Sequence, residues 1–127
     1  MNSKKILVVD DELEFLSMIR LRLEANDYEV ITATNGKEAL EKVKQEKPDA
    51  VLLDILLPGM NGLEVLKKIR HENKNLPVFI ITAFSSAERF ELANKFSASG
   101  FIVKTEDLKK EVENITNSIR IADKFKG

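Results

Sequence analysis

The chain has 127 residues, and its 20 basic and 21 acidic side chains leave a formal net charge of −1. Hydrophobic residues make up 43% and charged residues 32%, which is the balance of one globular domain that can bury a core. The even charge argues against a nucleic-acid-binding arm or a polybasic membrane anchor, and the absence of cysteine excludes disulfides, thiolate catalysis and cysteine-ligated zinc.

Short apolar runs alternate along the chain with segments of helical periodicity. Runs this short and continuous are typical of strands that are buried on both faces of a parallel sheet. In chain order, the predicted strands are Ile6–Val9, Tyr28–Ala33, Ala50–Leu53, Val78–Ile81 and Phe101–Val103.

A helix is predicted after each strand, because apolar residues in these segments recur three or four positions apart and would share one face. In chain order, the predicted buried stripes are Leu16, Ile19 and Leu23; Ala39, Leu40 and Val43; Leu63, Val65, Leu66 and Ile69; Leu92, Ala93 and Phe96; and Leu108, Val112, Ile115 and Ile119.

Five strand–helix units with short connections predict an α/β domain with right-handed crossovers and a doubly wound parallel sheet. The flavodoxin-like strand order 2-1-3-4-5 suits five strands, and its switch point lies between the first and third strands. No linker, repeat or low-complexity segment interrupts the pattern, so residues 1–127 are expected to form a single domain.

Two of the predicted strands end in carboxylates. Asp10 and Asp11 follow the first strand, and Asp54 follows the third and precedes a loop that contains Pro58 and Gly59. Both strand ends fall at the switch point, where open α/β sheets bind their ligands. Two like charges about 4 Å apart repel by about 4 kcal/mol at an effective dielectric constant of about 20, so such a cluster calls for a cation. The pattern predicts a bound divalent cation and a reactive aspartate.

Polar residues also follow or end the fourth and fifth strands, as Thr82 and Lys104. Together with the pair Asp10 and Asp11, and with Asp54 in the run Asp-Ile-Leu-Leu-Pro-Gly-Met-Asn-Gly, they form a specific set at successive strand ends. On these residues the chain resembles, over its whole length, the receiver domain of two-component response regulators.

The resemblance implies that Asp54 accepts a phosphoryl group from a phosphohistidine. It also implies a bound Mg²⁺ ion, with Asp11 and Asp54 as direct ligands, Asp10 acting through water, and the backbone carbonyl of Leu56 as a further ligand. This expectation agrees with the preference of Mg²⁺ for carboxylate and phosphoryl oxygens.

Lys104 and Thr82 are expected to contact oxygens of the transferred phosphoryl group, whose charge is spread over three oxygens, and Lys104 to neutralise Asp54 at rest. The resemblance further implies a switch formed by Thr82 and Phe101, in which the aromatic ring fills space that the threonine vacates. The alternative, that Phe101 is an ordinary core residue, remains open at this stage.

Two apolar residues are expected to flank the path of water to the phosphorylated aspartate. These are Leu56, two positions after Asp54, and Phe84, two positions after Thr82. Neither side chain can orient a water molecule, so we expect a long-lived phosphoaspartate.

The chain departs from the family at Thr105, where receivers usually have a proline that follows a cis bond. A cis bond before a residue other than proline costs roughly 3–4 kcal/mol, so we expect either a trans bond or retained strain after Lys104. Thr105 can instead cap the final helix, with Glu106 and Asp107 in its first turn.

The chain resembles the stand-alone receivers of phosphorelays and chemotaxis, and no output domain is expected. The implied partners are a sensor histidine kinase or a histidine phosphotransfer protein and an unknown downstream protein, with no nucleic acid or membrane. We expect a cytoplasmic protein, because the four apolar residues before Asp10 are too few for the hydrophobic region of a signal peptide and no stretch reaches the length of a membrane span. We also expect a monomer. The candidate contact residues, apolar and off the core stripes, are Leu13, Phe15, Met18 and Phe90.

Three other classes share part of this pattern. A degenerate receiver that binds partners without phosphorylation would keep the fold, and only the departure at Thr105 supports it. A metal-dependent phosphohydrolase would need a second acid shortly after Asp54, where Leu56 stands, and a flavin-binding protein would need a phosphate-binding loop where this chain has Asp-Asp-Glu. We therefore expect a signalling module that catalyses only its own phosphorylation and dephosphorylation and does not turn over an external substrate.

Overall fold

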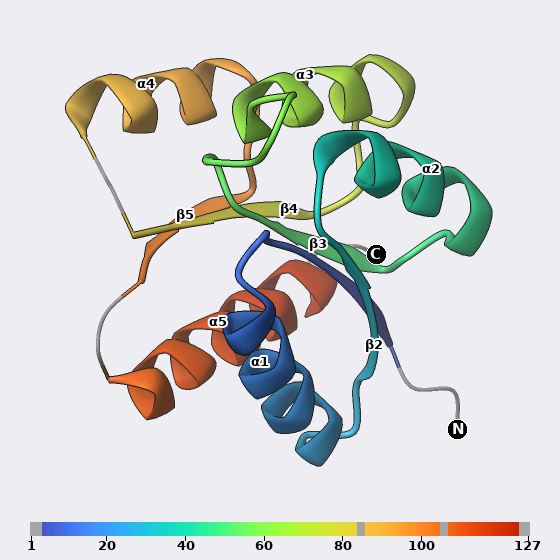
Figure 1. Ribbon diagram of the computed structural model, residues 1–127, viewed down its shortest axis with the longest axis vertical. Helices are drawn as coiled ribbons and strands as arrows, with labels where there is room; N and C mark the ends of the chain where they lie inside the picture. The colour runs from blue at the N-terminus through green and yellow to red at the C-terminus, as the bar shows by residue number, and fades with distance from the viewer. Residues whose placement is uncertain (1–3, 84–85, 105–106, 125–127) are drawn as a thin grey trace.

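Five parallel strands form one sheet in the order β2-β1-β3-β4-β5, which confirms the predicted fold class and strand order (Figure 1). The computed structural model describes residues 4–83, 86–104 and 107–124. The strands are β1 Lys5–Val9, β2 Glu29–Ala33, β3 Ala50–Leu53, β4 Val78–Thr82 and β5 Gly100–Val103, and the helices are α1 Leu13–Ala25, α2 Gly36–Glu46, α3 Gly62–Glu72, α4 Ala87–Lys95 and α5 Leu108–Lys124.

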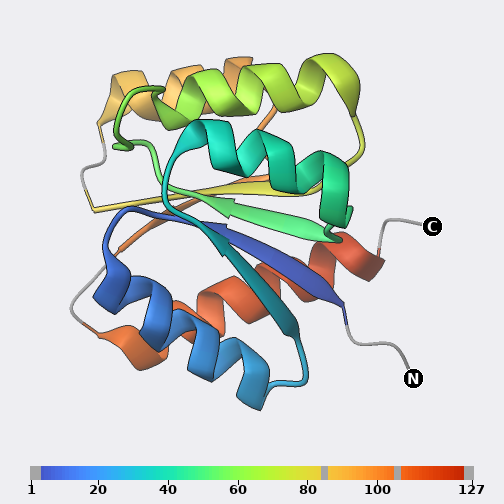
Figure 2. The ribbon, with the colours of Figure 1, turned by 45° about the vertical axis from the view of Figure 1, so that its right-hand side comes forward.

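The helices form two layers around the sheet, with α2, α3 and α4 on one face and α1 and α5 on the other (Figures 1 and 2). Because successive strand residues point to opposite faces, β1 supplies Leu7 and Val9 to the first layer and Ile6 and Val8 to the second. Each face therefore buries its own apolar cluster, and the sheet lies between them as the middle layer of three.

The predicted burial on both faces holds for β1, β3 and β4 but is wrong for the two edge strands. All four residues of β3 and all five of β4 are buried, whereas β5 is only partly buried and its Val103 is 42% exposed. The edge strands lie at the margin of the helical layers, so their apolar residues are covered less completely than those of the central strands.

The predicted helical stripes face the core wherever the structure describes them. Leu16, Ile19 and Leu23 of α1 are buried, and in α5 the same is true of Ile115 and Ile119. None of the helices in the described part of the chain combines the length and apolar composition that crossing a bilayer requires.

The final helix begins later than the sequence suggested. The first residue of α5 is Leu108, and the side chain of Asp107 accepts a hydrogen bond from the backbone N–H of Lys110 at 3.1 Å. Asp107 therefore occupies the capping position that was predicted for Thr105, because the helix starts directly after it. Thr105 and Glu106 lie outside the described residues, and so does the bond after Lys104.

Candidate functional site

The ends of β1 and β3 bring three carboxylates together. Val9 pairs with Leu53 in the sheet, and the ladder continues past the strand ends, because the backbone N–H of Asp54 donates to the carbonyl of Val9 at 3.0 Å. Carboxylate oxygens of Asp10, Asp11 and Asp54 all lie within 4.8 Å of one another. Asp10 and Asp54 are buried and Asp11 is exposed, so the cluster lies at the rim of the core and is open to solvent on one side.

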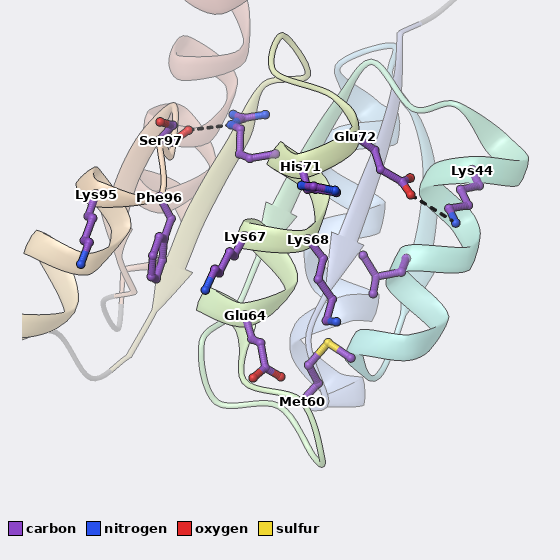
Figure 3. Close-up of a pocket in the computed structure, with 12 residues that line it drawn as sticks. Lys44, Met60, Glu64, Lys67, Lys68, His71, Glu72, Lys95, Phe96 and Ser97 are labelled. Carbon is purple, nitrogen blue, oxygen red and sulfur yellow. Dashed lines mark hydrogen bonds and ion pairs between the residues drawn. The ribbon is translucent and has the colours of Figure 1, made fainter.

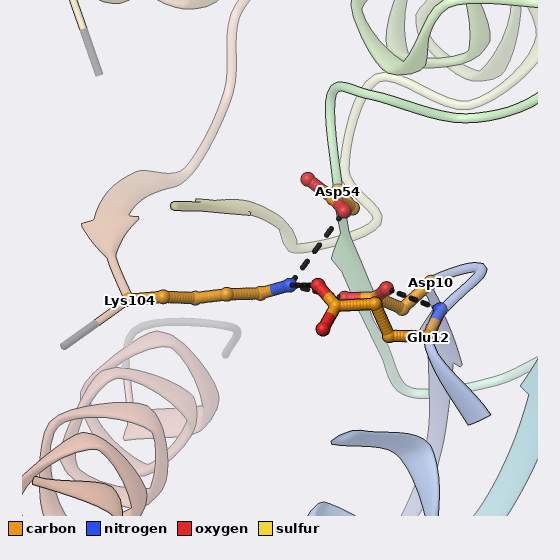
Figure 4. A network of polar contacts seen from close by, with 4 residues as sticks. All are labelled: Asp10, Glu12, Asp54 and Lys104. Atoms are coloured by element: carbon orange, nitrogen blue, oxygen red, sulfur yellow. Dashed lines mark hydrogen bonds and ion pairs between the residues drawn. The ribbon is translucent and has the colours of Figure 1, made fainter. Parts of the chain in front are cut away.

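A fourth charged side chain, that of Lys104, reaches this cluster from the end of β5 (Figure 4). Its ammonium lies 2.5 Å from Oδ2 of Asp10, 3.6 Å from Oδ2 of Asp54 and 3.5 Å from Oε1 of Glu12. The Lys104 side chain is only 8% exposed. Lys104 was expected to neutralise Asp54 at rest, but its shortest contact is with Asp10, which is deeper in the core.

The surroundings of Asp54 disfavour its charged form. Burial raises the pKa of Asp54 from 3.8 to about 6, and the charge of Asp10 adds to this effect. The charge of Lys104 and hydrogen bonds from the backbone of Leu56 and Ile55 act in the opposite direction. Asp54 is therefore mostly ionised at neutral pH, but its charge is easily neutralised.

Lys104 stays charged in spite of its burial. Burial alone would lower the pKa of the ammonium, but the hydrogen bond to Asp10 and the charges of Asp10, Asp54 and Glu12 outweigh it and raise the pKa above its ordinary value. The site thus holds a permanent cation within reach of its carboxylates.

The chain after Asp54 folds closely back on itself because residue 62 is a glycine. The backbone N–H of Gly62 donates to the carbonyl of Ile55 at 2.8 Å, and a Cβ at Gly62 would lie 1.9 Å from the backbone oxygen of Asp54. Asn61 caps α3, with its side chain accepting from the N–H of Leu63 at 2.7 Å. Asp54 is thus held between β3 and the start of α3.

Thr82 and Phe101 occupy the strands next to this site. Thr82 is fully buried at the end of β4, and its carbonyl accepts a hydrogen bond from the backbone N–H of Lys104 at 2.8 Å. Phe101 is half-buried in β5, and its ring meets that of Phe90 edge to face, with centroids 5.5 Å apart. Phe90 itself is 49% exposed, so this aromatic pair connects the core to the surface of α4.

The remaining predicted residues lie mostly on the surface. Leu56 is exposed directly beyond the acidic cluster, and Leu13 and Met18 are exposed on α1. Phe84 lies outside the described residues. Phe15 is less exposed than these residues: it is half-buried and packs against the core cluster beneath α1.

Two contacts of Lys104 were not foreseen from the sequence. Its ammonium lies 4.1 Å from the centroid of the Phe15 ring, and Glu12 approaches it from the loop before α1. The N–H of Glu12 also donates to Oδ1 of Asp10 at 2.9 Å. Both residues could have been suspected from their place in the sequence, because they follow the acidic pair closely and lie at the start of the first helix.

An open groove of about 930 Å³ runs along α3, away from the carboxylates (Figure 3). Much of its charge is already engaged, since Lys44 pairs with Glu72 at 3.7 Å and Arg70 donates to the carbonyl of Ser97 at 2.8 Å. Its other lysines, at positions 67, 68 and 95, are exposed. Among the described residues, three of the four buried polar side chains, Asp10, Asp54 and Thr82, lie at the strand ends and away from this groove.

Comparison with known proteins agrees with the geometry. The response regulator receiver domain family matches residues 6–116. The chain is 33% identical over 108 residues to sporulation initiation phosphotransferase F of Bacillus subtilis, covering 85% of this chain and 87% of that protein. It is 46% identical over 81 residues to the alkaline phosphatase synthesis transcriptional regulatory protein PhoP of the same species, covering 64% of this chain and 34% of that protein.

The fold has close structural neighbours as well. A CheY-like receiver domain protein from Methanospirillum hungatei JF-1 superposes with a TM-score of 0.88 at 29% identity, covering 97% of this chain and 98% of that one. Several curated relatives are longer, and the chain spans 24% to 52% of their length. The match of family, strand order and strand-end residues leads to one conclusion: the chain belongs to the response regulator receiver domain family.

Proposed function

We propose that this chain is a phosphoacceptor in a two-component signalling pathway, with Asp54 as the residue that is phosphorylated. One observation carries the proposal. Asp54 lies with two further carboxylates within 4.8 Å, and the charged Lys104 lies 3.6 Å from it at the edge of the sheet where ligands bind.

The proposed chemistry needs no general base. An oxygen of ionised Asp54 attacks the phosphorus of a phosphohistidine, the P–N bond breaks, and the donor imidazole leaves with its electron pair and takes up a proton. The products are an aspartyl phosphate and a neutral histidine on the donor. The donor would be a sensor histidine kinase or a histidine phosphotransfer protein.

The acidic cluster fits a divalent cation. Its three carboxylates supply the hard oxygen donors that Mg²⁺ prefers, and one of them is open to solvent, so room remains for water ligands. We assign Asp10, Asp11, Asp54 and the backbone carbonyl of Leu56 to this ion. Bound Mg²⁺ would offset the negative charge of the carboxylates and of the incoming phosphoryl group.

Lys104 and Thr82 are assigned to the oxygens of the phosphoryl group. The Lys104 ammonium is already within 3.6 Å of Asp54, and Thr82 ends the strand that pairs with β3. A pull of the phosphoryl group on Thr82 would free space for Phe101, and the contact of Phe101 with Phe90 would carry the change to the surface of α4. The output is then the binding of a partner or onward transfer of the phosphoryl group.

The lifetime of the phosphorylated state depends on access of water. Leu56 is 42% exposed beside Asp54 and cannot orient a water molecule, which favours slow hydrolysis. The same role is proposed for Phe84. The half-life of the phosphoprotein should shorten in Leu56→Asn and Phe84→Glu, and an unchanged half-life in both would contradict the assignment.

The contact surface for partners is proposed on the exposed apolar residues near the site, Leu13 and Met18 on α1 and Phe90 on α4, with Phe15 at its margin. Leu13 is 69% exposed, which suits a side chain that is covered by a partner. The free protein is expected to be a monomer.

Intact-mass analysis after incubation with acetyl phosphate and Mg²⁺ tests the proposal. We expect one phosphoryl adduct on the wild-type chain, and none on Asp54→Ala or when the metal is chelated. The absence of an adduct in protein that binds Mg²⁺ would refute the proposal and favour a receiver that binds partners without phosphorylation.

A further inference from the structure

The ammonium of Lys104 has an aromatic neighbour in addition to its three carboxylates. The Phe15 ring presents its face to Nζ at 4.1 Å from the centroid, well inside the range of about 6 Å in which a cation is attracted to a ring face. Lys104 is nearly excluded from solvent, and attraction of this kind is worth more when the cation is desolvated.

Phe15 is anchored on one side by the core. It lies in the first turn of α1 and packs against the core cluster formed by α1, α5 and the sheet. Its neighbour Leu16 belongs to the buried stripe of the same helix. The ring therefore has a core side and a side that faces the ammonium.

The contacts of Lys104 must rearrange if the site works as proposed. Its shortest contact is with Asp10 at 2.5 Å, while Asp54 lies at 3.6 Å. A cation that binds the carboxylates would compete with Lys104 for Asp10, and the ammonium would then shift toward Asp54. A ring face attracts a cation over its whole area and sets no single hydrogen-bond direction, so it can hold the ammonium in both positions.

From these contacts we infer that Phe15 is a positioning residue for Lys104: its ring holds the ammonium at the mouth of the site while the lysine changes its partner from Asp10 to the group on Asp54. This inference rests on the proposed function. It assigns to Phe15 a role inside the site, separate from a contact with partner proteins. An unsupported lysine would instead sample many rotamers and lose side-chain entropy each time it engaged.

Two variants separate this role from simple packing. Phe15→Leu removes the ring and keeps an apolar side chain against the core. Trifluorophenylalanine at position 15 keeps the shape of the ring and weakens the negative potential of its face, which leaves the fold undisturbed if Phe15→Leu should fail to fold. Leu21→Ala is the matched control, because Leu21 lies on the same helix and is 69% exposed.

The kinetic test uses acetyl phosphate as the donor, so no partner protein can contribute. With Mg²⁺ present, phosphorylation of Phe15→Leu should be about five- to tenfold slower than that of the wild type, the trifluoro protein should be slowed in the same direction, and Leu21→Ala should match the wild type. Wild-type rates in both ring variants would overturn the inference.

Calorimetric titration with Mg²⁺ distinguishes positioning from structural damage. A lysine that is held less firmly competes less well for Asp10, so the ring variants should bind Mg²⁺ as tightly as the wild type or more tightly. Weaker Mg²⁺ binding together with slower phosphorylation would show general loosening of the site and would count against the inference.

A third measurement is independent of phosphorylation. Cε of Lys104 is bonded to Nζ, which lies 4.1 Å from the centroid of the Phe15 ring, so the resonances of its protons should be shifted upfield in wild-type protein and should return to ordinary values in Phe15→Leu. The assignment comes from the loss of this signal in Lys104→Met. Unshifted resonances in the wild type would overturn the inference, and because no phosphoryl donor is needed, the result stands even if Asp54 accepts no phosphoryl group.

Discussion

At the scale of single residues, the main feature is a buried cation shared unequally by two buried carboxylates. Lys104 is close to Asp10 and more distant from Asp54, and Asp54 is the group whose charged form is disfavoured, with a pKa of about 6. The unequal contacts leave Asp54 the less neutralised of the two carboxylates, which suits the role of nucleophile that we propose for it.

Removal of the lysine charge should destabilise the metal-free protein. Lys104→Met leaves Asp10, which is fully buried, without its cation, and we expect a loss of about 3–5 kcal/mol in the free energy of unfolding at neutral pH. Mg²⁺ supplies a replacement cation, so it should stabilise the variant more than the wild type. Urea unfolding with and without Mg²⁺ measures both effects, and equal stability of the two metal-free proteins would contradict the prediction.

Stability of the metal-free protein should fall as the pH rises from about 4 to about 6. The pKa of Asp54 is higher in the folded state, at about 6, than the ordinary value of 3.8, so the folded state binds the proton more tightly and loses this advantage as the group ionises. A shift of this size corresponds to about 3 kcal/mol.

Asp54→Asn should remove this pH dependence and be the more stable protein above about pH 6. Denaturant unfolding in the presence of a chelator, at about pH 4 and about pH 7.5, provides the measurement. A wild-type protein whose stability rises over this interval relative to Asp54→Asn would show that the charged form of Asp54 is favoured after all.

At the scale of elements, the connection from β3 to α3 determines where Asp54 points. The backbone of Asp54 passes so close to Gly62 that no side chain fits at position 62. Gly59, with φ of +76°, has open space around it. A glycine is needed at position 62 because the neighbouring backbone leaves no room for a Cβ, and at position 59 because the backbone has a positive φ.

Substitution at these two glycines should therefore have different results. Gly62→Ala should cost about 2–4 kcal/mol and slow the phosphorylation of Asp54, because the added methyl group must displace the backbone of Asp54. Gly59→Ala should cost about 1 kcal/mol for its left-handed backbone and leave the rate unchanged. Thermal unfolding and acetyl phosphate kinetics on both variants test the distinction, which fails if Gly62→Ala is phosphorylated at the wild-type rate.

The start of α2 offers a contrasting site that contributes to stability alone. The side chain of Asn35 accepts from the N–H of Glu38 at 2.9 Å, and Oε1 of Glu38 accepts from the N–H of Thr34 at 2.8 Å. Asn35→Ala should lower the free energy of unfolding by about 1 kcal/mol, Asn35→Gly by only a few tenths, and neither should change phosphorylation. A large loss in Asn35→Gly would mean that Asn35 does more than cap the helix.

Much of the element order could be predicted because it depends on local patterns. Continuous apolar runs identified the strands, and the carboxylates that follow β1 and β3 had to meet once those strands were neighbours. The preference of Lys104 for Asp10 could not be predicted, because it depends on how far a side chain from β5 reaches across the sheet. The contact with Phe15 was missed for a related reason, since helical periodicity says which face of α1 is buried but not what the rim of that face touches.

At the scale of the whole molecule, metal binding and folding should be linked. The three carboxylates come from segments that are adjacent only in the folded sheet, so Mg²⁺ should bind the folded state and raise its stability, by about 2.7 kcal/mol at one hundred times its dissociation constant. Asp11→Asn should remove most of this gain. Control samples that contain Na⁺ and no divalent cation should show no gain. A melting temperature that does not depend on Mg²⁺ concentration in the wild type would refute the link.

The pairing of Lys104 with Asp10 joins residues 94 positions apart in the sequence. Because synthesis runs from the N-terminus, the acidic pair leaves the ribosome well before the lysine that pairs with it. A nascent or truncated chain that lacks β5 would carry the aspartates without their cation. The proposed phosphoacceptor site is thus completed only once β5 has been synthesised, so shorter products should accept no phosphoryl group.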